Sequence, residues 1–279
     1  DGIRGRLAFV NRDRSGGFKD IFNGTESGGA KRTSVRGQLE FDLGDNGDLR
    51  LMAGYVDKKG DCCSPDVLLG GVSQSFLAAF KKPADTAQFN RVTAYSDPYQ
   101  FDGEQYDFIA ELNYKFDWGT FTSTTSFDHF EFRSNFDSEQ SALALTLFKD
   151  RQESDAFAQE FRLTSTSDGD FNWMAGAFYY DNDFVRGSLD PNKAMFVLGA
   201  DIGPAPQPGA TGDKAMFRSS NDTRHWSVFA QGDWQLAPRY VFSAGARFID
   251  ETKAIDARSA LQVAALPSLA SALTVPVPI

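Results

Sequence analysis

The chain has 279 residues, of which 41% are hydrophobic, 14% are aromatic and 24% are charged, and 26 of them are Phe. Its formal net charge of −10 argues against a nucleic-acid-binding surface, which requires clustered Lys and Arg. Because no apolar run reaches the roughly 18 residues of a membrane-spanning helix, the sequence predicts no such helix. A high share of aromatic residues in a chain that is hydrophilic on average instead favours a sheet with one apolar face and one polar face in contact with water.

Nine stretches alternate between apolar and polar residues, and this period of two predicts β-strands. The clearest stretch places Val35, Leu39 and Phe41 on one face and Arg36 and Glu40 on the other. The expected strands are residues 2–12, 33–43, 49–58, 105–117, 120–133, 156–166, 171–184, 226–236 and 240–251. We therefore expect an all-β chain whose strands are antiparallel and follow one another up and down.

Two local irregularities are expected within this pattern. Phe121 lies on one side of the fifth strand, whereas Phe130 and Phe132 have the opposite parity, which predicts a β-bulge near 127–129. Apolar residues spaced by four within 67–82 predict a short helix in a long connection.

Short and long connections alternate along the chain. The short ones are 44–48, 117–119, 167–170 and 237–239, and the long ones are 13–32, 59–104, 134–155, 185–224 and 252 onward. Bacterial outer-membrane barrels have short periplasmic turns and long extracellular loops, so the alternation predicts a transmembrane β-barrel wall. Trp226 and Trp234, near opposite ends of one strand, suit the two aromatic girdles of such a wall.

Several segments resemble, in order, the barrel of a TonB-dependent outer-membrane receptor of Gram-negative bacteria. They are LRLMAGYVDKKGDCC (49–63), FDWGTFTSTTSF (116–127), FAQEFRLTST (157–166), FNWMAGAFYY (171–180) and WSVFAQGDWQLAPRYVFSAGARFIDETK (226–253). The similarity covers about residues 2–255 and implies a 22-stranded type of barrel with a plugged lumen. We expect residues 1–279 to form part of that barrel domain, a fragment without the plug and the last strands.

The resemblance implies energy-coupled uptake of a scarce, large solute, such as a ferric siderophore, cobalamin or an oligosaccharide, at the cell outer membrane. Its implied partners are outer-membrane lipid, the barrel assembly machinery, an extracellular small solute and, through the plug, the TonB energy-transducing complex. We expect no nucleic-acid partner, no cofactor and no enzymatic activity. Two alternatives stay open: a passive porin-like channel and a soluble β-protein that binds glycans.

The candidate site residues fall into two groups. Cys62 and Cys63 are candidates for a vicinal disulfide, but pairing with cysteines elsewhere and free thiols stay open. Six charged residues on the polar strand faces are expected to face the lumen, where they would contact a plug or a solute: Arg36, Glu40, Asp107, Glu111, Glu160 and Arg162. The long loops 59–104 and 185–224 are stronger candidates for solute selection. His129, next to Asp128, and His225 lack a nucleophile motif, so the sequence predicts no catalytic triad.

Overall fold

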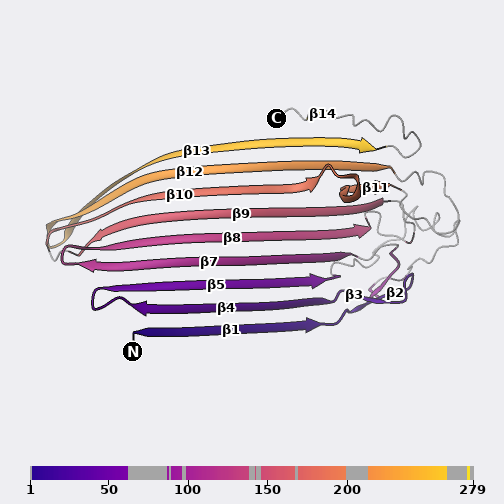
Figure 1. Cartoon of the computed structure of the whole chain (residues 1–279), viewed down its shortest axis with the longest axis horizontal. Coiled ribbons are helices and arrows are strands. Elements are labelled where there is room, and N and C mark those ends of the chain that lie inside the picture. Colours follow the sequence, from indigo (N-terminus) through magenta and orange to yellow (C-terminus); the bar gives the residue numbers. More distant parts are fainter. Residues whose placement is uncertain are drawn as a thin grey trace.

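The structure is a computed structural model. It describes residues 2–61, 87, 89–95, 99–137, 142, 146–166, 169–198, 213–262 and 275–276. These residues form one large antiparallel sheet of 11 strands and a separate sheet of three short strands (Figure 1). The helix expected at 67–82 lies outside the described residues.

Nine long strands make up the large sheet. They are β1 (Ile3–Arg14), β4 (Ala30–Asp42), β5 (Gly47–Gly60), β7 (Gln100–Phe116), β8 (Gly119–Asp137), β9 (Thr146–Ser165), β10 (Phe171–Ser188), β12 (Lys214–Ala237) and β13 (Tyr240–Gln262). Consecutive long strands pair with one another, so β1 and β13 each have one long neighbour, and the short strands β11 (Phe196–Leu198) and β14 (Val275–Pro276) join at one end. The expected antiparallel up-and-down arrangement is confirmed, and each expected range overlaps one long strand.

The two ends of the sheet differ in their connections. At the turn side the chain reverses within 43–46, 117–118, 166–170 and 238–239, and at the loop side it runs through 15–29, 61–99, 138–145 and 189–213 (Figure 1). Gly44 has a φ of 71°, a left-handed conformation that glycine adopts without a Cβ clash. The predicted alternation of short and long connections is therefore present.

Most strands extend further toward the loop side than the sequence predicted. β9 begins at Thr146 and β12 at Lys214, about ten residues before the expected starts. Parts of these extensions are polar on both faces, as in Lys149-Asp150-Arg151-Gln152-Glu153, so the apolar alternation that marks a half-buried strand is lost there. Backbone pairing with equally long neighbours keeps the segments extended.

The prediction of a β-bulge near 127–129 is wrong. β8 keeps an unbroken register with both β7 and β9 across this region. Phe130 and Phe132 lie on one face of the sheet and Phe121 lies on the other, because even- and odd-numbered positions alternate along an unbroken strand. Among the described residues the one irregular register lies in β12, between Gln235 and Ala237.

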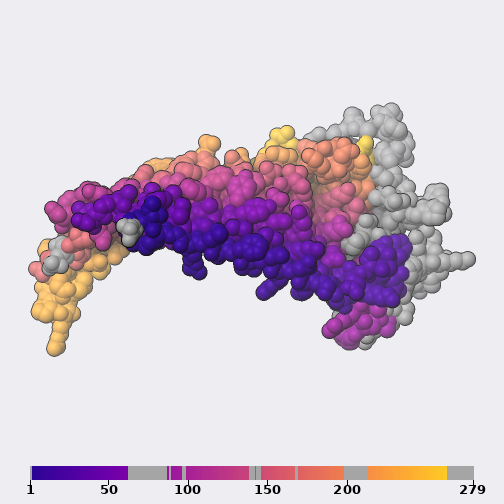
Figure 2. Space-filling model, turned by 60° about the horizontal axis from the view of Figure 1, so that its bottom comes forward, coloured from indigo at the N-terminus to yellow at the C-terminus, as the bar shows by residue number. Residues whose placement is uncertain are grey.

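The two faces of the sheet differ in chemistry. We call the side that carries Leu39, Phe108 and Phe161 the outward face, and the side that carries Glu40 and Glu160 the inward face. Cross-strand registers keep each set on one side throughout. Phe108 is 43% exposed and Phe161 48%. Figures 1 and 2 show the long strands in one bent layer, and in the described part of the chain no second long sheet covers the aromatic residues.

Two bands of aromatic rings cross the outward face. The turn-side girdle joins Tyr114, Phe116, Trp118 and Trp173 through successive ring-centroid distances of 4.9, 5.4 and 6.2 Å. The loop-side girdle contains Tyr106 and Phe127, 6.2 Å apart, then Phe157 and Tyr179, 6.3 Å apart, and Trp226. Tyr106 and Tyr114 are eight positions apart on β7, about 27 Å along a strand, or about 20 Å of height at the usual barrel tilt.

Enclosed apolar contacts are few. Ala194, Met216 and Ala260 form one small cluster beside the 3-10 helix η1 (Pro191–Lys193), at the loop side. Within the described ranges, no helix is long and apolar enough to cross a membrane. Without an enclosed core, the sheet depends on strand pairing and on whatever medium covers its outward face.

The small sheet ties two loop-side connections together. β2 (Phe18–Asp20) pairs with β3 (Glu26–Ser27) and, in parallel, with β6 (Val92–Thr93), which belongs to the connection between β5 and β7. Asp20 is fully buried, and its Oδ1 accepts hydrogen bonds from the backbone N–H groups of Phe22 and Asn23 at 2.8 and 3.3 Å.

Charge placed on the outward face tests this assignment of the two faces. Phe161 lies midway between the girdles, so Phe161→Arg should destabilise the assembled barrel by about 2–4 kcal/mol, the cost of a cation at a bilayer midplane. The free energy is measured by urea titration in lipid vesicles. The control is Thr124→Arg, which places the same charge on the inward face beside Glu160. Equal losses for both variants would contradict the assignment.

Candidate functional site

The six charged residues expected to face the lumen all lie on the inward face. β4 supplies Arg36 and Glu40, β7 supplies Asp107 and Glu111, and β9 supplies Glu160 and Arg162. The registers between neighbouring strands from β4 to β9 align these positions on one side of the sheet. They are spread across the wall rather than gathered at one point, so they do not form a single site.

Each of these charges has an opposite charge nearby. Arg36 Nη2 lies 3.9 Å from Asp107 Oδ1, across Gly54 of the intervening strand, where a Cβ would meet the Asp107 carboxylate. The other pairs are Arg4–Glu40 at 3.0 Å, Arg50–Glu111 at 3.4 Å and Arg162–Glu160 at 3.8 Å. These pairs neutralise the wall locally, and their contact with a plug or a solute stays a prediction.

A different set of inward residues is not neutralised. Arg12 of β1 lies opposite Arg32 of β4, and Arg32 lies opposite Lys58 of β5. Like charges directly opposite one another on adjacent strands destabilise a sheet. All three side chains are exposed, and none forms an ion pair with a carboxylate in the described ranges. We call these residues the cation row.

Two aromatic rings lie beside the cation row on the same inward face. Lys58 lies opposite Gly103, which has no side chain, and Gly103 lies opposite Phe132. Phe132 and Phe101 stack with centroids 6.4 Å apart. Three cations beside a pair of aromatic rings can hold an anion through charge-assisted hydrogen bonds and can pack a flat apolar group next to it.

A polar hollow of about 560 Å³ lies on the inward faces of β10, β12 and β13. Lys253 Nζ lies 2.9 Å and His225 Nδ1 lies 3.6 Å from the Glu251 carboxylate at its edge. Asn221 Oδ1, which also lines the hollow, is buried without a hydrogen-bond partner among the described residues. The inward face therefore offers a second polar contact surface, several strands away from the cation row.

The sequence of this two-faced sheet matches the family model for the TonB dependent receptor-like β-barrel over residues 64–270. The chain belongs to this family. TonB-dependent receptor barrels are outer-membrane proteins of Gram-negative bacteria, so the sheet is the wall of such a barrel and its short connections are the periplasmic turns. A search of curated proteins found no match to the sequence.

Solved structures of TonB-dependent receptors share the fold. The ferric yersiniabactin uptake receptor FyuA from Yersinia pestis aligns with 98% of this chain and 37% of its own, at 11% identity and a TM-score of 0.67. The open form of the ferric-catecholate import receptor Fiu from E. coli K12 aligns with 100% of this chain and 44% of its own, at 14% identity and a TM-score of 0.59. FpvA of P. aeruginosa aligns with 94% of this chain and 36% of its own, at 12% identity and a TM-score of 0.59. The chain spans less than half the length of each.

The two histidines lie on opposite faces of the receptor wall, His129 outward and His225 inward. His129 is on the outward face, where its Nδ1 lies 2.7 Å from Asp155 and its ring stacks on Tyr106 at 4.5 Å. Asp128 points to the other face and accepts a hydrogen bond from Gln105 at 3.0 Å. Cys62 and Cys63 lie outside the described residues, so the disulfide stays a prediction. Within the described ranges, no group of three or more His, Cys, Asp or Glu could hold a metal ion.

Gly176 makes room for a stacked pair in the receptor lumen. A Cβ at this position would meet the Phe229 ring and the Phe161 carbonyl oxygen, the latter at 2.6 Å. The Arg247 guanidinium lies over the Phe229 ring at 5.7 Å and donates to Ser227 Oγ at 2.8 Å.

Gly176→Val should therefore destabilise the assembled barrel by about 1–3 kcal/mol through overpacking. The matched control is Gly37→Val, because nothing lies within 4 Å of a Cβ at Gly37 on the outward face. Urea titrations of both variants in vesicles give the difference. A Gly176→Val barrel as stable as the Gly37→Val barrel would show that Phe229 does not pack where the structure places it.

Proposed function

We propose that this chain is part of a receptor that takes up a scarce, large solute through the Gram-negative outer membrane with energy from the TonB complex. The observation that carries the proposal is the two-faced sheet, with two aromatic girdles outside and a charged wall inside, in a member of the TonB-dependent receptor family. A lipid-facing band bordered by aromatic residues and a polar lumen are what an outer-membrane barrel requires.

The cation row favours one chemical class of solute over the others. Arg12, Arg32 and Lys58 lie near the loop side of the lumen, where a solute arriving from outside would first meet the wall. Uncompensated cations favour an anionic solute, such as a ferric siderophore with carboxylate or catecholate oxygens, over a neutral oligosaccharide. The family relatives FyuA and Fiu are receptors for ferric yersiniabactin and for ferric-catecholate import, which supports this choice.

The remaining partners follow from the same proposal. Outer-membrane lipid would cover the outward face, and the barrel assembly machinery would insert the strands. The TonB complex would act through a plug inside the lumen, and the paired charges of Arg36, Asp107 and Glu160 would contact that plug or the passing solute. We propose no catalytic step for any residue of the wall.

Energy dependence separates the proposal from a passive channel. Cells that express the complete receptor should accumulate a labelled ferric siderophore, and accumulation should fall to background when the TonB complex is deleted. Accumulation that persists at the same rate without the TonB complex would instead show a porin-like channel.

Neutralising the cation row should weaken solute binding. For each of Arg12→Gln, Arg32→Gln and Lys58→Gln, loss of a charge-assisted hydrogen bond of about 1.5–3 kcal/mol corresponds to a roughly tenfold or larger rise in Kd. Binding is measured by tryptophan fluorescence on purified receptor. The matched control is Arg6→Gln, which removes an exposed inward arginine from the same strand but nearer the turn side. Unchanged affinity in the triple variant would refute the role of the row.

A further inference from the structure

Along β8 the inward face changes from polar side chains to aromatic rings. From the turn side its inward residues are Thr120, Thr122, Thr124, Ser126 and Asp128, followed by Phe130, Phe132, Ser134 and Phe136. A wall that meets only water has no need of apolar side chains, and apolar side chains gathered at a wet surface mark a contact site. The loop-side part of the inward face is therefore suited to an apolar partner.

Seven rings form a continuous chain on this part of the inward face. Successive ring centroids lie 6.3, 6.4, 6.5, 5.5, 4.8 and 4.8 Å apart. We call this chain the aromatic ladder, and in order it contains Phe130, Phe132, Phe101, Tyr99, Phe136, Phe148 and Phe196. The rings come from β8, β9 and β11 and from the start of β7, because Phe148 lies directly opposite both Phe136 and Phe196. From Phe130 to Phe136 the ladder extends about 20 Å along the strand.

Positive charge dominates the inward rows beside Phe130, Phe132 and Phe101. Across the nine long strands these three rows contain one carboxylate, Asp150, and five cations: Arg12, Arg14, Arg32, Lys58 and Arg186. Asp150 is compensated, because Arg186 donates to its two oxygens at 2.9 and 3.1 Å and Gln152 donates at 2.7 Å. The surroundings of the ladder therefore attract an anion.

The aromatic ladder and the cation row meet at Gly103. The Phe132 ring lies over this glycine, where a Cβ would meet the ring at 3.4 Å, and Gly103 lies directly opposite Lys58. A ring and an ammonium group thus occupy adjacent positions on one face. One flat ring of a solute can stack on Phe132 while oxygens on that ring accept hydrogen bonds from Lys58.

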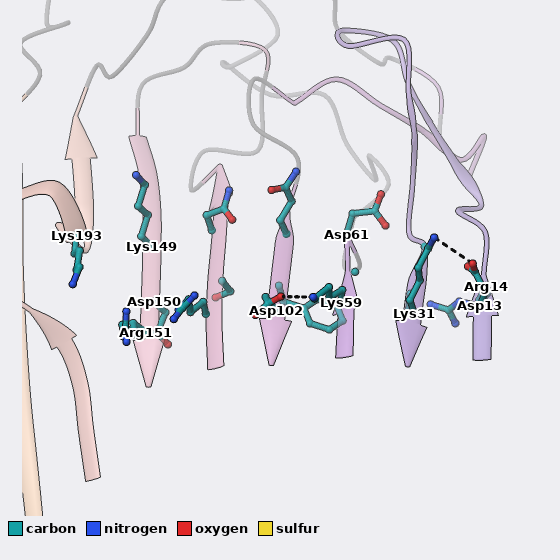
Figure 3. A pocket seen from close by; sticks show the side chains of 18 of the residues that line it. Asp13, Arg14, Lys31, Lys59, Asp61, Asp102, Lys149, Asp150, Arg151 and Lys193 are labelled. Atoms are coloured by element: carbon teal, nitrogen blue, oxygen red, sulfur yellow. Dashed lines mark ion pairs between the residues drawn. The ribbon is translucent and has the colours of Figure 1, made fainter. Parts of the chain in front are cut away.

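A hollow of about 1010 Å³ at the loop-side strand ends provides space beside the ladder (Figure 3). Its lining includes one complete inward row: Arg14, Ala30, Gly60, Phe101, Ser134 and Asp150. Half of these residues have a small side chain or none, which leaves room next to the Phe101 ring. Figure 3 shows the outward neighbours Lys31 and Lys59 paired with Asp13 and Asp102, at N–O distances of 3.3 and 3.6 Å, so these two cations are already compensated.

From these observations we infer that the aromatic ladder makes the receptor select solutes whose anionic oxygens are attached to flat aromatic rings, such as catecholate chelates, over aliphatic solutes of equal charge. The inference rests on the proposed uptake function and adds the chemical class of the solute. The cations attract both kinds of anion, whereas the rings gain contact only with a solute that has an aromatic face.

Two inert metal complexes separate the role of the rings from that of the charges. Chromium(III) tris-catecholate and chromium(III) tris-oxalate have the same formal charge and the same octahedral geometry, but only the tris-catecholate carries aromatic rings. The purified complete receptor is dialysed to equilibrium against each complex, and bound chromium is measured by elemental analysis. We expect the Kd of the tris-catecholate to be about tenfold lower than that of the tris-oxalate.

Replacing two rings of the ladder should remove this preference. Phe132→Leu/Phe148→Leu keeps both side chains apolar, and it should raise the Kd of the tris-catecholate about tenfold while that of the tris-oxalate changes by less than about twofold. The matched control is Phe127→Leu/Phe157→Leu, which makes the same two changes on β8 and β9 but on the outward face and should leave both Kd values unchanged. Phe132→Tyr/Phe148→Tyr keeps the rings and should retain the preference. Heat-modifiable gel mobility confirms that each barrel is assembled.

Three results would overturn the inference. Equal affinity of the unaltered receptor for the two complexes would show that the rings pack against the receptor's own connections and not against the solute. Binding of neither complex, or an equal loss of both in the double Leu variant, would also contradict a selective role of the rings. Dialysis does not involve the TonB complex, so a retained preference together with accumulation that persists without that complex would count against the proposed function alone.

Discussion

Complete backbone pairing is the constraint on which the rest of this structure depends. Inside a bilayer no water is available for an unpaired N–H or C=O group, so a spanning sheet must pair every strand with its neighbours. From β1 to β13 each long strand does so with its sequence neighbours, in a register that is regular through the region between the girdles. An unbroken register keeps alternate side chains on opposite sides, and this separates the aromatic outward face from the charged inward face.

The same register determines how charges meet one another. Between the girdles the inward charges form pairs, such as Arg36 with Asp107 and Arg50 with Glu111, which suits a wall beside water or a plug. Toward the loop side the pairing becomes incomplete on the inward face, where none of Arg12, Arg32 and Lys58 has a carboxylate partner among the described residues. Arg133 and Arg151, one row further on the outward face, share the Glu131 carboxylate, whereas the cation row presents its positive charge to the lumen.

Much of this arrangement could be predicted from the sequence, because apolar alternation and turn residues act locally. For that reason the sequence predicts the strands around Val35–Phe41 and Phe157–Leu163 and the short connections at the turn side. The loop-side extensions were not predicted, since a segment such as Lys149–Glu153 is polar on both faces and is kept extended by its partners. The cation row was missed because it appears only when strands are aligned. The short connection between β4 and β5 could have revealed that Arg32 lies opposite Lys58, whereas Arg12 joins them across a long connection.

The assignment of the two faces requires that the aromatic side chains of the wall contact lipid while the charged side chains contact water. Nitroxide labels placed one at a time from Ala156 to Thr164 of β9, in a receptor with Cys62 and Cys63 replaced by Ser and reconstituted in vesicles, test it most directly. Collision with dissolved oxygen should dominate at Phe157, Phe161 and Leu163, and collision with a water-soluble nickel complex should dominate at Ala158, Glu160 and Arg162. Equal exposure of both sets to the nickel complex, or the reverse alternation, would show that the aromatic face does not contact lipid.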